Sequence, residues 1–350
     1  MMSSARLRLV LAAVATTAIL AGCAQPAPPP PPPAPPPVPS VSLSNKLLDQ
    51  ASAYRAYVDR AAQISPAFTD GANVAQSLKT GESYEPGQFL RGAIAYGAVV
   101  ALQDPAFRAG VRTYAADADQ RRTVAYSIMK DPAYVLGITG AQSAAGLVTS
   151  ALGDDGKKLL DQGRAVKQAA YDVQHYAWSK SDVAARESRL AMAKQLSATP
   201  ISGSTDITAK LELAVAGSQP MTLAADPASP PYTPLVVRSL AVAALGALGY
   251  ADDASLEQVM PLTAEPASAQ CLNMSKLNLY QCLAVAKPHY EDVFCLGQHV
   301  LMDTGQCLMK GVGVAEPAPP PPPVQLTPVS TKGSAKGAKS RARTLKGKRP

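Results

Sequence analysis

Four cysteines near the C-terminus are the residues whose type and spacing most clearly indicate chemistry: Cys271, Cys282, Cys295 and Cys307. Their successive gaps are 11, 13 and 12 residues. Four-thiolate zinc sites usually contain cysteine pairs about two to four residues apart, and redox-active dithiols usually form C-x-x-C motifs. The sequence has neither pattern. Because an even number of cysteines in an oxidising compartment favours disulfides, we expect two structural disulfides and no metal site.

Sequence alone rarely decides how four cysteines pair. Here each half of the segment reads Cys-Leu and then, about ten residues later, Gln-Cys-Leu, which favours the local bonds Cys271–Cys282 and Cys295–Cys307. In one straight helix such partners would lie more than about 16 Å apart, whereas a disulfide needs Cα atoms about 4.4–6.8 Å apart. The local pairing therefore requires the chain to turn within each pair, and we place these turns at residues 273–275 and 303–305.

Candidate acid–base residues are few. The three histidines are His175, His289 and His299, and none lies in a metal-binding or catalytic motif. His289 is close to Glu291 and Asp292, which would permit acid–base or metal chemistry, but Pro288-His289 also has the form of a helix start. The helix start is the simpler interpretation.

Glu82 and Glu85 could supply the proton-donating carboxyl of a cell-wall glycosidase. A loop glutamate beside proline and glycine is nevertheless ordinary, so the sequence predicts no catalytic residue and no cofactor. A folded pocket that gathers Glu85, His175 or His289 with other polar groups would favour an enzyme. An exposed groove on a closed apolar core would favour a binding protein.

The N-terminus has the order of a secretory signal. Arg6 and Arg8 precede an apolar run from Leu9 to Leu20, which is shorter than the roughly 20 residues that span a bilayer. The run ends in Leu20-Ala21-Gly22-Cys23. This ending resembles the lipobox of bacterial lipoproteins, and the resemblance covers only residues 1–23.

The resemblance implies that residues 1–22 are a signal peptide and are removed, and that Cys23 carries diacylglycerol and acyl chains such as palmitate. Two or more acyl chains make membrane anchoring stable. Residue Ala24 is not the aspartate that commonly retains lipoproteins in the inner membrane. By resemblance the protein therefore faces the periplasm from the outer membrane, with the outer leaflet of the inner membrane as the alternative. The proline run over 26–39 is typical of an extended spacer.

The net charge of +7 is unevenly distributed. The body from Ser40 to Glu316 has 23 basic against 26 acidic residues, so it is mildly acidic. The tail after Glu316 contains a second proline run and no acid. This composition predicts disorder and attraction to polyanions, with a merely solubilising tail as the alternative. Its basic residues are Lys332, Lys336, Lys339, Arg341, Arg343, Lys346, Lys348 and Arg349.

The body is rich in alanine and only 5% of the chain is aromatic, which favours helix. Residues 92–102 and 239–249 are apolar on every side, so we expect two buried central helices that are too short to cross a bilayer. The proline-free stretch 156–196 predicts one long half-exposed helix, or two with a break near 179–181. A thinner helix is expected over 206–216.

Three similar phrases, Ser65-Pro66, Asp104-Pro105 and Asp131-Pro132, have the form of helix starts, with an N-cap followed by proline. Duplicated helical hairpins are the alternative origin of this similarity. The proline-rich stretch 218–234 is a long loop and a candidate binding loop.

These patterns predict an all-α fold: a single alanine-rich helical domain with two buried apolar helices and a disulfide-stapled C-terminal segment. We divide the chain into a signal peptide (1–22), a lipidated cysteine and proline-rich linker (23–40), the helical domain (41–315, with the four-cysteine segment at 271–310) and a disordered tail (316–350).

The expected function is that of a membrane-anchored periplasmic lipoprotein, a structural or binding protein of the cell envelope. Its basic tail would contact an anionic cell-wall polymer, lipopolysaccharide or envelope protein, and nucleic acid is the least expected polyanion because the chain is secreted. The alternative is an enzyme that acts on cell-wall or envelope substrates.

Overall fold

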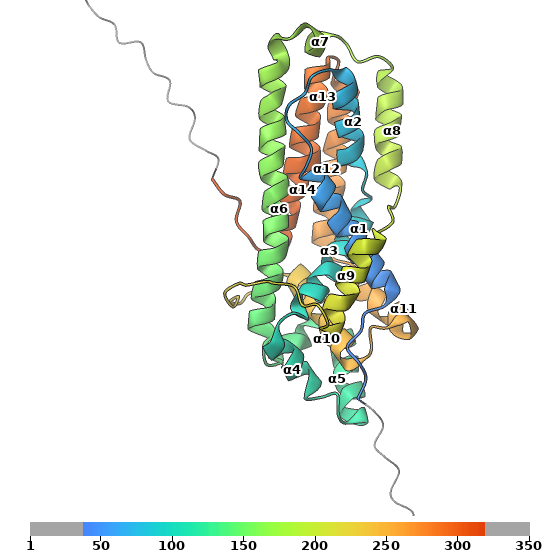
Figure 1. The fold of residues 1–350 in the computed structure, drawn as a ribbon, viewed down its shortest axis with the longest axis vertical. Helices are drawn as coiled ribbons and strands as arrows, with labels where there is room; N and C mark the ends of the chain where they lie inside the picture. The colour runs from blue at the N-terminus through green and yellow to red at the C-terminus, as the bar shows by residue number, and fades with distance from the viewer. Residues whose placement is uncertain (1–37, 319–350) are drawn as a thin grey trace, which may run out of the picture. The chain divides into compact units, whose positions relative to one another are not determined.

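Helical propensity governs the regular structure. The computed structural model describes residues 38–318, and within that range the regular elements are helices, with no β-strand (Figure 1). The only extended pairing recorded there is an isolated bridge between Asp182 and Pro288. The predicted all-α fold class is confirmed.

The α-helices of the first half are α1 (Asn45–Ala61), α2 (Gly71–Glu82), α3 (Pro86–Ala101), α4 (Pro105–Arg112), α5 (Ala118–Lys130) and α6 (Ala141–Asp172). Those of the second half are α7 (Ala177–Lys180), α8 (Arg186–Ala198), α9 (Thr205–Ala216), α10 (Pro234–Leu248), α11 (Leu256–Val259), α12 (Pro266–Val285), α13 (His289–Cys295) and α14 (Asp303–Gly311). Short 3-10 turns connect several of them, and a π-helical segment, η5 (Leu296–Met302), joins α13 to α14.

The two all-apolar segments form the centre of the core, as predicted. They lie in α3 and α10, whose central residues are buried on all sides. The two helices pack against each other. Each begins with proline at its first position behind a capping side chain, Glu85 for α3 and Thr233 for α10. The caps satisfy backbone N–H groups that a helix start leaves unpaired.

Helix starts were predicted correctly at two of the three proline phrases. Asp104 caps α4, and Asp131 caps a 3-10 turn over Pro132–Gly137. The first phrase is different: Ser65 forms a local turn, and the following helix begins at Gly71 with Asp70 as its cap. Proline after a polar residue therefore marks a bend in all three places but a helix in only two.

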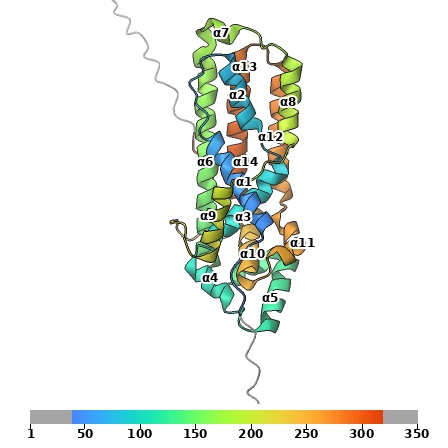
Figure 2. The same ribbon diagram turned by 45° about the vertical axis from the view of Figure 1, so that its right-hand side comes forward.

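The long helix α6 begins fifteen residues before the predicted start at 156, because Gly140 in the left-handed conformation (φ 86°) sets its N-terminus. The predicted break near 179–181 lies within a wider irregular region over 173–185 that contains only short helical turns. After it, α8 lies beside α2 and α12, on the side away from α6, in both views (Figures 1 and 2).

Helix α6 packs against η5 and α14 with its backbone close to theirs. A Cβ atom added at Gly163 would lie 2.6 Å from the backbone nitrogen of Met302 and 2.8 Å from the carbonyl oxygen of Gly297. No side chain fits at that distance, so glycine is required for the two helices to meet. Small residues thus allow close helix packing at this contact.

Aromatic residues are few, but several of them pack together at one place in the core. Five of them form one cluster between α1 and α3, with neighbouring ring centroids 4.6–5.7 Å apart. The cluster consists of Tyr54, Tyr57, Tyr84, Phe89 and Tyr96. An aromatic-poor sequence therefore still has aromatic anchors, because they are gathered at one site.

The four cysteines form two disulfides, as expected, but the predicted local pairing is wrong. The bonds are Cys271–Cys307, with Cα atoms 5.7 Å apart, and Cys282–Cys295, with Cα atoms 5.8 Å apart. The predicted turns do not exist: α12 runs unbroken through residues 273–275, and 303–305 lie inside α14. Because Cys271 and Cys282 share one helix, they cannot bond to each other, and each crosses to the antiparallel arm formed by α13, η5 and α14 instead.

Candidate functional site

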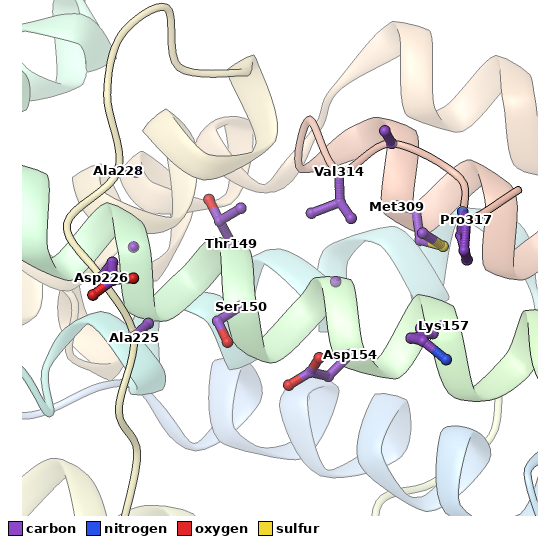
Figure 3. Close-up of a pocket in the computed structure, with 13 residues that line it drawn as sticks. Thr149, Ser150, Asp154, Lys157, Ala225, Asp226, Ala228, Met309, Val314 and Pro317 are labelled. Carbon is purple, nitrogen blue, oxygen red and sulfur yellow. The ribbon is translucent and has the colours of Figure 1, made fainter.

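A groove of about 610 Å³ lies along one face of α6 (Figure 3). Its floor consists of residues on successive turns of that helix, and the polar ones are Thr149, Ser150, Asp154 and Lys157. Figure 3 shows these side chains in a row along the helix, between a loop on one side and the chain after α14 on the other.

The first wall is the predicted binding loop, which the structure describes as an irregular segment over 217–233. Its backbone is fixed to α6, because the N–H of Ala228 donates to the carbonyl of Gln142 at 3.0 Å. The hydroxyl of Tyr232 donates to the carbonyl of Ala228 at 3.0 Å. A Cβ added at Gly146 would lie 2.1 Å from the carbonyl oxygen of Asp226, so a glycine at this turn of α6 lets the loop cross the helix.

The second wall is the extended chain after α14, which includes Val314 and Pro317. Arg164 fixes it to α6: one guanidinium nitrogen donates to a Glu316 carboxylate oxygen at 3.0 Å and to the Pro317 carbonyl at 2.9 Å. The side chain of Gln306 donates to the same carboxylate at 2.9 Å. The groove therefore has two fixed walls and does not depend on a mobile contact.

The groove offers hydroxyls, two aspartate carboxylates and one ammonium group. Lys157 is paired with Asp161 on the same helix, whereas Asp154 and Asp226 form no ion pair within the described residues. Hydroxyls and free carboxylates accept hydrogen bonds from hydroxyl, amide and amino groups. The groove therefore offers hydrogen-bonding groups along α6 beside apolar walls that include Ala225, Met309 and Val314, and its lining contains no buried acid–base pair that would indicate catalysis.

A second and smaller cavity, of about 170 Å³, contains three of the residues considered from the sequence, Glu82, His289 and Asp292. It lies among α2, α8, α13 and the residues before α8. The sequence indicated no partner for Asp292, which in the structure pairs with Arg189 of the same cavity. Arg189 and Asp292 lie on different helices, so no short sequence motif indicates that they pair.

Beside that cavity, Lys276 is buried in α12. Its ammonium donates to the backbone carbonyl of Glu82 at 2.7 Å and lies 3.5 Å from the ring centroid of Tyr84. Burial lowers the pKa of Lys276 well below its usual value, although the carboxylates of Glu82 and Glu85 oppose this shift. Burial likewise raises the pKa of Glu82 to about 7, against the opposing charge of Lys276.

The other residues singled out in the sequence lie apart. Glu85 caps α3 through the N–H groups of Gly87 and Gln88. His175 stacks on its neighbour Tyr176. His299 is hydrogen-bonded to Asp303 at 2.9 Å. Of the three residues named as markers of an enzyme, only His289 lines a cavity with other polar groups.

Within the described range, no group of three or more histidine, cysteine or acidic side chains is placed to hold a metal ion. None of the described helices is long and apolar enough to cross a membrane. The predicted lipidation residue, Cys23, and the predicted polyanion-binding residues of the tail from Lys332 to Arg349 lie outside the described residues.

No protein-family model, curated protein or solved structure matches this chain. Its function must therefore be inferred from its own residues and geometry.

Proposed function

We propose that the protein is a lipid-anchored binding protein of the cell envelope, which holds an anionic envelope polymer beside its helical body. The lipobox-like Cys23 supports the anchor, and the proline-rich residues that follow it support a spacer. The binding role rests on one structural observation: the groove on α6 is bordered by the chain segment that leads into the basic tail.

Connectivity places the start of the tail at the groove. Pro317 lines the groove, and the sequence continues directly into the second proline run and the eight basic residues. A polymer attracted by the tail would therefore meet the polar floor of α6. Cell-wall glycan and lipopolysaccharide carry both the anionic groups that the tail would attract and the hydroxyl and amide groups that Asp154 and Asp226 could accept from.

The anchor is tested by Cys23→Ser. We expect this variant to lose acylation and to appear in the soluble periplasmic extract, because burial of acyl chains, at about 0.8 kcal/mol per CH₂, supplies the membrane affinity. Fractionation with detection of lipid on the protein measures both effects. A variant that stays membrane-bound and is processed normally would contradict the anchor.

The binding role is tested by cosedimentation of the soluble Cys23→Ser protein with purified cell-wall sacculi and with lipopolysaccharide vesicles. Removing residues 329–350 should weaken binding at low salt, and added salt should weaken the longer form similarly, because exposed charges are screened beyond about 10 Å at 0.1 M. Ser150→Trp, which fills the groove, should weaken binding further.

Ala165→Trp is the matched control, since it adds the same ring to an exposed position of α6 outside the groove. Equal binding by the truncated and longer proteins would remove the tail from the mechanism. An equal loss of binding in the Ser150→Trp and Ala165→Trp variants would exclude the groove from the binding mechanism.

A further inference from the structure

The cavity among α2, α8 and α13 contains two buried polar atoms without partners. Within the described residues, Oε2 of Glu82 and Nε of Arg189 have no hydrogen-bond partner, and both residues line the cavity. The Glu82 residue is 1% exposed. Since more than about 90% of buried polar groups in native structures are paired, each of these atoms indicates a missing partner. One atom accepts a hydrogen bond and the other donates one, so a ligand in the cavity that carries both a donor and an acceptor would supply the two missing partners.

The charges around these atoms indicate what that molecule carries. The positive charge of Arg189 is already balanced by Asp292, which is 3% exposed, so Arg189 offers mainly its Nε–H donor. Lys79 lines the exposed side, and in the described part of the chain no carboxylate lies within ion-pair distance of it. A ligand carboxylate would therefore meet the Nε–H of Arg189 and the ammonium of Lys79. A ligand ammonium group would meet Glu82.

The size and the remaining walls limit the ligand further. A volume of about 170 Å³ holds roughly six water molecules, which is too small for an oligosaccharide. The side chains between the charged groups are apolar: Ala75, Leu78, Val183, Ala184 and Met192. They would surround a short aliphatic group, and the polar side chains of Ser188 and His289 also line the cavity.

We propose that this cavity binds a free α-amino acid with a small aliphatic side chain, its ammonium on Glu82 and its carboxylate on Arg189 and Lys79. Ala185 supports a site built for a ligand. It lines the cavity at φ 51°, and it is the one non-glycine residue with positive φ among those described. Such backbone strain persists only where the surroundings impose it and is frequent at ligand clamps. The proposal is independent of the groove on α6.

The soluble Cys23→Ser protein, titrated calorimetrically with glycine, alanine, valine and leucine, tests the proposal. We expect saturable binding of at least one of them. The corresponding N-acetyl amino acid and amino-acid amide, which each lack one charge, should bind about 10- to 100-fold more weakly, because each loses one charge-assisted hydrogen bond. Near pH 7 binding of the amino acid should also release protons from Glu82, which is seen as a dependence of the heat on the buffer.

Three variants locate the site. Glu82→Gln should reduce affinity for the amino acid about 10- to 100-fold while leaving that for its N-acetylated analogue unchanged. Met192→Trp should block the cavity without altering a charge, and Leu213→Trp is its control, since the two side chains are similarly exposed at 39% and 38%. Lys79→Gln should weaken binding, whereas Lys46→Gln on α1 should not.

Three results would overturn the proposal. The first is the absence of saturable binding by the folded protein at millimolar amino acid, which would mean that ordered water alone satisfies Glu82 and Arg189. The second is equal affinity for the amino acid and its singly charged analogues. The third is undiminished binding by Met192→Trp, which would place the ligand elsewhere.

Discussion

Removing the two disulfides is expected to lower the free energy of unfolding by several kcal/mol. The bond Cys271–Cys307 closes a separation of 36 residues, and Cys282–Cys295 lies inside it with a separation of 13. In the chain-entropy model loops of these lengths stabilise a fold by about 4 and about 3 kcal/mol respectively. Because the inner loop lies within the outer one, the two contributions should not add fully.

Paired variants separate the two bonds. Cys271→Ala with Cys307→Ala should cost more stability than Cys282→Ala with Cys295→Ala, as measured by denaturant unfolding. The half-buried Cys271 leaves little cavity when truncated, so the loss should mainly reflect the bond.

Non-reducing peptide mapping checks the pairing directly. Peptides that join Cys271 to Cys307 and Cys282 to Cys295 are expected. A peptide that joins Cys271 to Cys282 would contradict the antiparallel arrangement of α12 with α13 and α14, and four free thiols would contradict both bonds.

The error in the predicted pairing shows what the sequence could not supply. The distance argument was correct, since partners 11 residues apart on a straight helix cannot bond. The predicted pairing depended on whether the chain bends at residues 273–275, and the asparagine and serine there suggested that it does. In the fold Ser275 is a helix-interior residue whose hydroxyl donates to the carbonyl of His299 at 2.7 Å. A tertiary contact thus explains a residue type that local reasoning assigns to a turn.

Elements defined by local chemistry were predicted well, because their signals lie within a few residues. The apolar helices α3 and α10, the helix α9 and the loop after it all follow from periodicity, caps and prolines. The polar cavity was not predictable in this way. Glu82, Arg189, Lys276 and Asp292 come from four different helices, and nothing in the sequence near Arg189 indicates that Asp292 lies against it.

The burial of Glu82 could not be predicted for the same reason, since it depends on contacts between helices that are far apart in the sequence. As one of two acids near a proline and a glycine, it appeared no more informative than Glu85. The fold buries Glu82 at the end of α2 and leaves Glu85 as a helix cap. Burial therefore distinguishes the two, and burial is a property of the packed helices.

Stability should fall as pH rises from about 4.5 to about 7, in part because of Glu82. Its pKa is about 7 in the fold, against an ordinary value of 4.5, because burial disfavours the carboxylate. In that window the folded protein binds more protons than the unfolded chain, so raising the pH favours unfolding. The stabilisation from the protonated form is fully present below pH 4.5 and is lost as pH rises through 7. A shift of this size corresponds to about 3 kcal/mol.

Glu82→Gln isolates this contribution, because glutamine resembles the protonated acid and does not titrate. We expect the stability of the variant relative to the parent protein to increase by about 3 kcal/mol between pH 4.5 and 7 and to stay constant at higher pH. Urea unfolding at a series of pH values measures it. Glu187→Gln, which changes an exposed acid in the first turn of α8, is the control and should leave the pH profile nearly parallel to that of the parent.

The charged groups around Glu82 do not remove the expected difference between the pH profiles of the parent protein and Glu82→Gln. The titratable groups around Glu82 are Lys79 on its own helix, Lys276 on α12, Arg189 on α8, and Asp292 and His289 on α13. Burial also raises the pKa of Asp292, but that group titrates in both proteins, so its effect is largely removed from the difference. Lys276 acts in the opposite sense, since burial lowers its pKa and favours the fold at high pH. Parallel profiles of parent and Glu82→Gln between pH 4.5 and 7 would mean that Glu82 is ionised and solvated in the fold, and the cavity would then offer a permanent carboxylate rather than a titrating one.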